Sequence, residues 1–144
     1  MMKLVKLIIL FVLLSACNTK AQVTITNAWV RANVPGQAVG AAYMTLESSQ
    51  DSSLIAVESS VADSVEIHSM TMNGGVMKMR MLDELDLKAG KAEKLAPGGF
   101  HLMLFDLKKP LKAGENVTFK LSFKDKTNKI TYQSLVLPIK ETFD

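Results

Sequence analysis

Apolar and polar positions alternate along most of the chain beyond residue 22. The clearest stretch is VTITNAWVR at 23–31, and VMKMRML at 76–82 repeats the pattern. Alternation with a period of two indicates strands with one buried face, and no window beyond the first 16 residues shows a helical period near 3.6. The predicted strands are Val23–Arg31, Gly40–Glu47, Leu54–Glu58, Val65–Met72, Val76–Leu82, two short strands within Asp83–Leu95, Phe100–Phe105, Val117–Phe123 and Ile130–Leu137.

Turn signals separate these strands at near-regular spacing, as in Asn33–Gln37 and Pro97–Gly99. Short, regularly spaced strands joined by turns are typical of a β-sandwich or a small Greek-key barrel. We therefore predict an all-β domain over residues 23–138 and a short tail over 139–144.

The strongest hairpin signal is Asn73-Gly74, since a type I′ turn needs positive φ at both central residues. With these two residues in the loop, His68 faces Met79 across the hairpin. A turn centred on Gly74-Gly75 instead places His68 opposite Met81. In either case Met77, Met79 and Met81 share one face of the return strand.

The first 16 residues predict a lipoprotein signal peptide. A basic start, Met1–Lys6, precedes an apolar run, Leu7–Leu14, which is too short to span a bilayer as a helix. Leu14-Ser15-Ala16-Cys17 resembles the bacterial lipobox, which implies cleavage before Cys17 and a lipidated cysteine, with residues 17–22 as its tether. The alternative is a secreted protein cleaved near Ala21.

Charge and cysteine content exclude several function classes. The net charge of +3 falls to +1 without Lys3 and Lys6, and no basic stripe of the kind that binds nucleic acid is visible. Cys17 is the single cysteine, so the predicted domain has neither a disulfide nor a thiolate metal ligand. We also find no arrangement of residues typical of a catalytic site, and we expect a protein that is not an enzyme.

Both histidines and six of the nine methionines lie between Glu66 and Met103. His101 and Met103 are two apart on a predicted strand and therefore project from the same face. Together with His68 and Met79 they offer two imidazole nitrogens and two neutral thioethers, a soft set that favours Cu(I). We predict a Cu(I) site formed by His68, Met79, His101 and Met103; Met44 is expected in the core.

These four residues also carry a resemblance to a known family. His68, Met79 and the pair His101 and Met103 match the H-x10-M-x21-H-x-M pattern of the periplasmic Cu(I) chaperones of the PCu(A)C type, and flanking stretches are similar over about residues 22–137. The resemblance implies a cupredoxin-like β-sandwich whose four motif ligands hold Cu(I). Its implied role is delivery of copper to the CuA centre of cytochrome c oxidase or to its assembly factors.

Some members of that family carry a His- and Met-rich C-terminal extension, whereas the tail from Pro138 has neither residue type. The expected protein is thus a copper chaperone that carries one Cu(I). We expect it to be anchored by Cys17 to a membrane on the periplasmic side of the cell envelope. Two alternatives remain open: a copper-buffering or resistance protein, and a structural β-sandwich lipoprotein whose methionines only pack.

Overall fold

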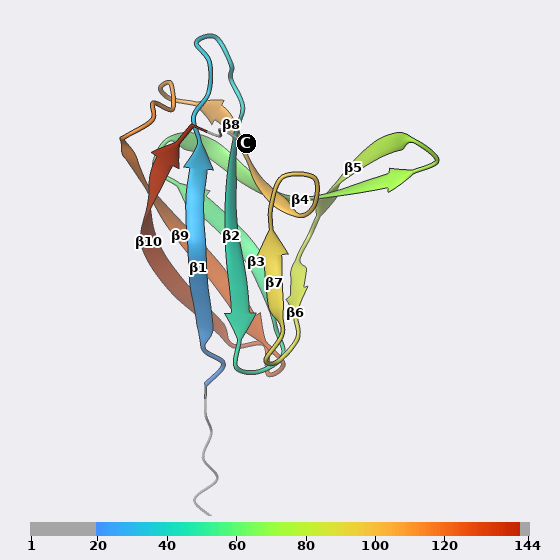
Figure 1. Cartoon of the computed structure of the whole chain (residues 1–144). Coiled ribbons are helices and arrows are strands. Elements are labelled where there is room, and N and C mark those ends of the chain that lie inside the picture. Colours follow the sequence, from blue (N-terminus) through green and yellow to red (C-terminus); the bar gives the residue numbers. More distant parts are fainter. Residues whose placement is uncertain (1–19, 142–144) are drawn as a thin grey trace, which may run out of the picture.

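The computed structural model describes residues 20–141, and this part of the chain contains ten β-strands (Figure 1). All the predicted strands are present, with ends that differ by at most three residues. The strands are β1 (Val23–Arg31), β2 (Gly40–Ser48), β3 (Ser52–Ser59), β4 (Ala62–Asn73), β5 (Val76–Leu82), β6 (Leu85–Leu87), β7 (Ala92–Leu95), β8 (His101–Leu107), β9 (Asn116–Asp125) and β10 (Ile130–Lys140).

Seven of the strands close into a barrel in the order β4, β8, β2, β1, β10, β9, β3. The ring closes because β3 pairs with β4, at Val57 and Val65, as well as with β9. β1 and β10 run parallel, whereas the other paired strands are antiparallel. The remaining strands β5, β6 and β7 extend from β4, β3 and β2. The predicted all-β barrel is confirmed.

The barrel interior is filled by aliphatic and aromatic side chains, because every second residue of each strand points inward. Fully burying a Leu or Phe side chain stabilises the fold by roughly 1.5–3 kcal/mol. Met44, 1% exposed, belongs to this core, as the sequence predicts. The largest fully buried side chains are Phe119, Phe123, Met44, Leu46, Leu54, Leu87, Leu95, Leu102, Leu104, Leu111, Leu121 and Leu137.

β10 is longer than predicted and corrects the proposed start of the tail at residue 139. Ile139 and Lys140 pair in parallel with Val30 and Arg31 of β1. Ile139 is 2% exposed, so its burial in the core offsets the turn tendency that Pro138 gives to the sequence. This pairing completes the barrel between β1 and β10.

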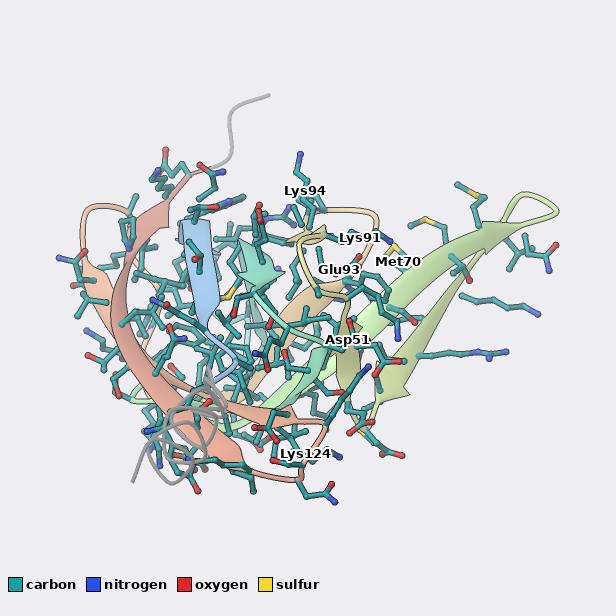
Figure 2. The ribbon with its side chains drawn as sticks, turned by 90° about the horizontal axis from the view of Figure 1, so that it is seen from below. Asp51, Met70, Lys91, Glu93, Lys94 and Lys124 are labelled. Carbon is teal, nitrogen blue, oxygen red and sulfur yellow. The ribbon has the colours of Figure 1, made fainter. Side chains whose placement is uncertain are left out.

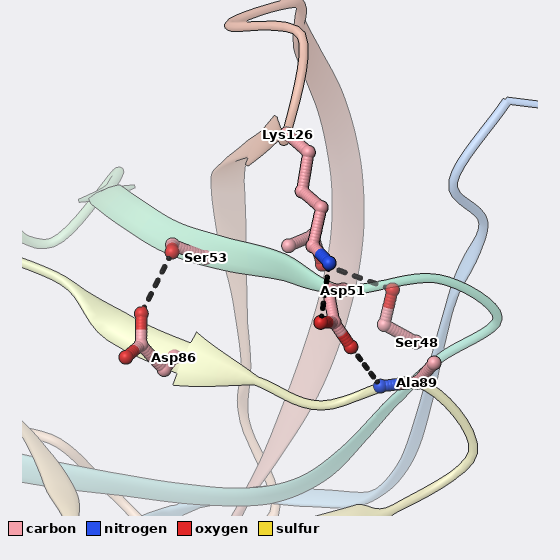
Figure 3. Close-up of polar contacts among 7 residues, drawn as sticks. Ser48, Asp51, Ser53, Asp86, Ala89 and Lys126 are labelled. Carbon is pink, nitrogen blue, oxygen red and sulfur yellow. Dashed lines mark hydrogen bonds and ion pairs between the residues drawn. The ribbon is translucent and has the colours of Figure 1, made fainter.

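Asp51 ties three connections together at the end of the barrel where β2 turns into β3 (Figure 3). Its carboxylate accepts a hydrogen bond from the backbone N–H of Ala89 at 2.8 Å and forms an ion pair with Lys126 Nζ at 2.8 Å. The bond from Lys126, followed by that from Ala89, lowers the pKa of Asp51. The β2–β3, β6–β7 and β9–β10 connections are thus held to one another by a single side chain.

The predicted signal peptide, residues 1–16, and the predicted lipidation site Cys17 lie outside the described residues. Within residues 20–141 the structure has no helix long and apolar enough to cross a membrane.

Candidate metal centre

The β4–β5 hairpin turns on two glycines. Gly74 and Gly75 have φ of +58° and +79°, and Asn73 pairs with Val76 as the last rung of the ladder. The prediction that Asn73 and Gly74 form the loop, with His68 facing Met79, is therefore wrong. Two consecutive glycines adopt the two left-handed conformations of a type I′ turn without a Cβ clash, so Asn73 stays in the strand.

The observed register pairs soft side chains along one face of the hairpin. His68 lies opposite Met81, Met70 opposite Met79, and Met72 opposite Met77. Lys78 and Arg80 project from the other face, because residues alternate along a strand. The register is the alternative given above, and it makes Met70 the direct neighbour of the predicted ligand Met79.

The second part of the predicted site lies on the strand next to β4. β8 pairs with β4 so that His101 is directly opposite His68, and Met103 is directly opposite Glu66. The two imidazole rings are 5.7 Å apart between centroids and are inclined by 51°. Both histidines are buried, with exposures of 8% for His68 and 4% for His101. The barrel thus brings the two histidines together across adjacent strands.

Met79, His101 and Met103 line one hollow of about 370 Å³, together with Met70. The rest of its wall comes from the β1–β2 connection, the start of β2 and the turn before β8. His68 does not line this hollow but lies against the His101 ring. Three of the four predicted ligands therefore share a cavity, and the fourth contacts one of them.

Met81 faces His68 across the hairpin but lines a different hollow, together with Glu66 and Leu82. Met79, by contrast, opens into the same cavity as His101 and Met103. Strand register alone would favour Met81 as the partner of His68, whereas the cavity favours Met79. Met79 is the diagonal neighbour of His68 across the hairpin, and such neighbours are still within reach of long side chains.

The hydrogen bonds of the two histidines show which ring nitrogen of each keeps a lone pair that a metal ion can use. His101 Nδ1 lies 2.9 Å from the carbonyl oxygen of Gly99 and donates its proton to it, which leaves the lone pair on Nε2. His68 Nε2 lies 2.7 Å from the Glu66 carboxylate and donates to it, so the lone pair is on Nδ1. That Nδ1 is buried and has no hydrogen-bond partner in the described structure. An orphaned buried acceptor of this kind fits a bound metal ion.

Glu66 is the residue that orients His68, since a carboxylate on the far nitrogen fixes the tautomer and makes a ligating imidazole more basic. We expect Glu66→Ala to lower Cu(I) affinity by about 10-fold or more. Glu66→Gln, which keeps a hydrogen-bond acceptor, should lose less. Anaerobic competition with a Cu(I) chelator measures both. Unchanged affinity in the alanine variant would mean that Glu66 has no positioning role.

The donor set determines which ions fit. Within residues 20–141 no group of three or more His, Cys, Asp or Glu side chains is arranged to hold a metal ion. Zn²⁺ and harder cations prefer ligands of these types. Because no third ligand of these types is arranged with the two imidazoles, an ion bound there would need thioethers to complete its coordination sphere. Neutral sulfur and nitrogen donors match a soft, singly charged ion.

Arg31 and Tyr43 also line the cavity, with the guanidinium 5.2 Å from the centroid of the Tyr43 ring. Burial raises the pKa of Tyr43, partly offset by the charge of Arg31. The phenol thus remains neutral at physiological pH. The lining of the cavity therefore carries one positive charge, that of Arg31, and no anionic side chain.

Comparison with known proteins gives the family. Residues 23–133 match the family model described as “Putative lipoprotein LpqE-like”. The chain belongs to this LpqE-like family. The LpqE-like chain is 35% identical over 106 residues to “Putative lipoprotein Lxx21020” of Leifsonia xyli subsp. xyli. It is 33% identical over 117 residues to “Uncharacterized protein RP573” of Rickettsia prowazekii. The alignments cover 72% and 77% of this chain, and 63% and 65% of those two relatives.

Solved structures share the fold of this LpqE-like chain. The Cu(I) form of DR1885 from Deinococcus radiodurans is 32% identical, covers 84% of this chain and 79% of its own, and has a TM-score of 0.66. The apo PCuAC domain from PmoF1 is 21% identical, covers 86% and 98%, and has a TM-score of 0.67. The LpqE-like chain is thus PCuAC-like, and its cupredoxin-like barrel is confirmed.

Proposed function

We propose that this protein is an extracytoplasmic copper chaperone that binds one Cu(I) tightly through His68, Met79, His101 and Met103. The observation that carries the proposal is the cavity shared by Met79, His101 and Met103, against which the second buried imidazole packs. Three of these donors share a cavity and the fourth, a buried imidazole, packs against one of them, an arrangement that core packing does not require.

The electrostatics of the site support Cu(I) over Cu(II). All four donors are neutral, and the Glu66 carboxylate, whose oxygen bonds His68, adds one negative charge nearby. The charges of Cu(I) and the carboxylate offset each other, while Arg31 in the cavity lining keeps its positive charge. Cu(II) would add a further uncompensated positive charge to this partly buried site, which is costly. Soft thioether ligands favour the same oxidation state.

The exposure of the ligands supports transfer rather than storage. The two histidines are buried, whereas Met79 is 47% exposed. A donor atom of an acceptor protein can therefore approach the ion on the Met79 side and replace the thioether. Since the ion keeps its charge and the departing thioether is neutral, this exchange requires no electron, and no ligand of this protein gains or loses a proton.

The proposed acceptor is the CuA site of cytochrome c oxidase or one of its assembly factors, in keeping with the PCu(A)C resemblance. The proposed location is the periplasmic side of the cell envelope, with a lipid on Cys17 as the anchor. Several acyl chains on one residue would hold the protein stably at a membrane, whereas one chain holds only marginally.

The test of the site is a copper-edge X-ray absorption spectrum of protein loaded anaerobically with one equivalent of Cu(I). We expect two nitrogen and two sulfur neighbours, because two imidazoles and two thioethers surround the ion. A shell without sulfur, or one with sulfur alone, would contradict the assignment.

A deletion strain separates delivery from copper buffering. Delivery predicts low cytochrome oxidase activity that added copper restores. Normal oxidase activity together with increased copper sensitivity would instead favour a buffering or resistance protein, which the same four ligands would serve.

A further inference from the structure

The β4–β5 hairpin extends away from the barrel (Figure 1). It presents methionines to solvent. Met72 is 69% exposed, Met77 56% and Met79 47%. Figure 2 shows sulfur atoms on one side of this hairpin, with Met70 near its base. Exposed apolar side chains grouped in this way mark an interaction site more often than chance, and here each grouped side chain ends in a soft donor.

The register makes these methionines a compact set of donors. Met72 is directly opposite Met77, and Met70 is directly opposite Met79 on the same face. Directly opposite residues have Cβ atoms about 5 Å apart, and the next pair along the strands lies about 7 Å away. Methionine has three rotatable bonds, so thioethers from neighbouring pairs can converge on one ion.

The surroundings of the hairpin methionines disfavour harder cations. Lys78 and Arg80 occupy the other face of the same hairpin and have no ion-pair partner among residues 20–141. No carboxylate cluster lies within the described chain to hold a Zn²⁺ or Ca²⁺ ion. A site made only of neutral thioethers near two positive charges should bind Cu(I) weakly. Weak binding is what a site that takes up and releases the ion quickly requires.

We propose that Met72 and Met77, together with Met79, form a second and weaker Cu(I) site on the hairpin, through which copper enters and leaves the buried histidine pair. The proposal rests on the proposed function and changes the expected load from one ion to one tight ion and one weak ion. The weak ion is held by the sulfurs of Met72 and Met77 alone whenever Met79 binds the tight one. Met79 belongs to both sites, since it shares a face of β5 with Met77, two residues away, and lines the cavity with His101.

Transfer between the two sites is a ligand exchange. Cu(I) remains bound to Met79 while its bonds to the sulfurs of Met72 and Met77 break and bonds to the histidine nitrogens and Met103 form. The charge of the ion does not change, and no proton moves because every ligand is neutral. Met70 borders the path between the sites.

The test compares wild type with a Met72→Leu, Met77→Leu double variant. Leucine keeps the size and apolar character of both exposed side chains and removes only the sulfurs. In an anaerobic titration against competing Cu(I) chelators, wild type should show one tight and one weak class of site. The variant should keep the tight class unchanged and lose the weak one. Stopped-flow transfer of Cu(I) from the loaded variant to excess chelator should be several-fold slower.

A Lys78→Gln, Arg80→Gln variant is the matched control on the other face of the hairpin, and it should keep both classes. A wild type with a tight class and no weak class would overturn the second site alone. A wild type with no tight class would overturn the proposed function. Loss of the tight class in the double leucine variant would show that Met72 and Met77 belong to a single site, which also contradicts the proposal.

Discussion

Replacing His101 by alanine is expected to lower the affinity for Cu(I) by more than about 100-fold. Loss of a residue that only orients a metal ligand costs about 10–100-fold, and a lost ligand should exceed that range. The free Nε2 of His101 points its lone pair away from the Gly99 carbonyl that fixes the ring. Equilibrium competition with a Cu(I) chelator under anaerobic conditions measures the change.

A second variant separates ligation from folding, because His101 is only 4% exposed. In His101→Asn the side-chain amide nitrogen takes the place of Nδ1 and keeps a donor for Gly99, while no atom replaces Nε2. Both variants should lose Cu(I) to the same extent if Nε2 is the ligand. Wild-type affinity in a folded His101→Asn protein, or equally weak binding by wild type and His101→Ala, would refute the chaperone function.

The second large effect is expected for a Met79→Leu, Met103→Leu double variant. Its affinity for Cu(I) should fall by at least about 100-fold, as for a lost histidine ligand. Its free energy of unfolding should change by less than about 1.5 kcal/mol, because Leu and Met have similar volumes. The two quantities are measured by chelator competition and by urea unfolding of the metal-free protein.

Met44→Leu is the control for this variant, since Met44 is 1% exposed in the core and distant from the predicted ligands along the chain. It should leave Cu(I) affinity unchanged and affect only stability. The opposite pattern in the double variant, a large loss of stability with normal Cu(I) binding, would assign Met79 and Met103 to packing.

The sequence predicts the strands well because each has one face in the core. β1 and β5 match their predicted bounds, and β8 alternates between core residues such as Leu102 and site residues such as His101. The pairing of β4 with β8 could not be predicted from the sequence. Their contact between His68 and His101 joins distant segments, and no local pattern specifies which strands become neighbours in a barrel.

Two local signals were misleading for identifiable reasons. Asn73-Gly74 is a good hairpin turn, but Gly74-Gly75 competes at the next position, and the glycine pair has the lower steric cost. Pro138 predicts the end of a strand, yet β10 continues because Ile139 is buried and pairs with β1. In both places a neighbouring residue outweighs a strong local preference.

The role of Glu66 was also absent from the sequence prediction, although its position carries a signal. Glu66 and His68 are two apart on one strand and therefore share a face, so a carboxylate beside the ring is expected. The carbonyl of Gly99 offers no such signal, because a backbone acceptor is identical at every position. Candidate ligands are thus easier to name from sequence than the atoms that would orient them.

The alternation along β8 and β4 has a consequence for the protein when no copper is bound. Leu102 and Leu104 belong to the barrel core, whereas His101 and Met103 lie on the opposite face. Small zinc domains unfold when their metal leaves, because the ion is part of their core. Here the interior is complete without cargo, so the empty carrier should keep its shape and resist proteolysis. If the protein carries copper as proposed, one molecule can then be refilled and reused for many rounds.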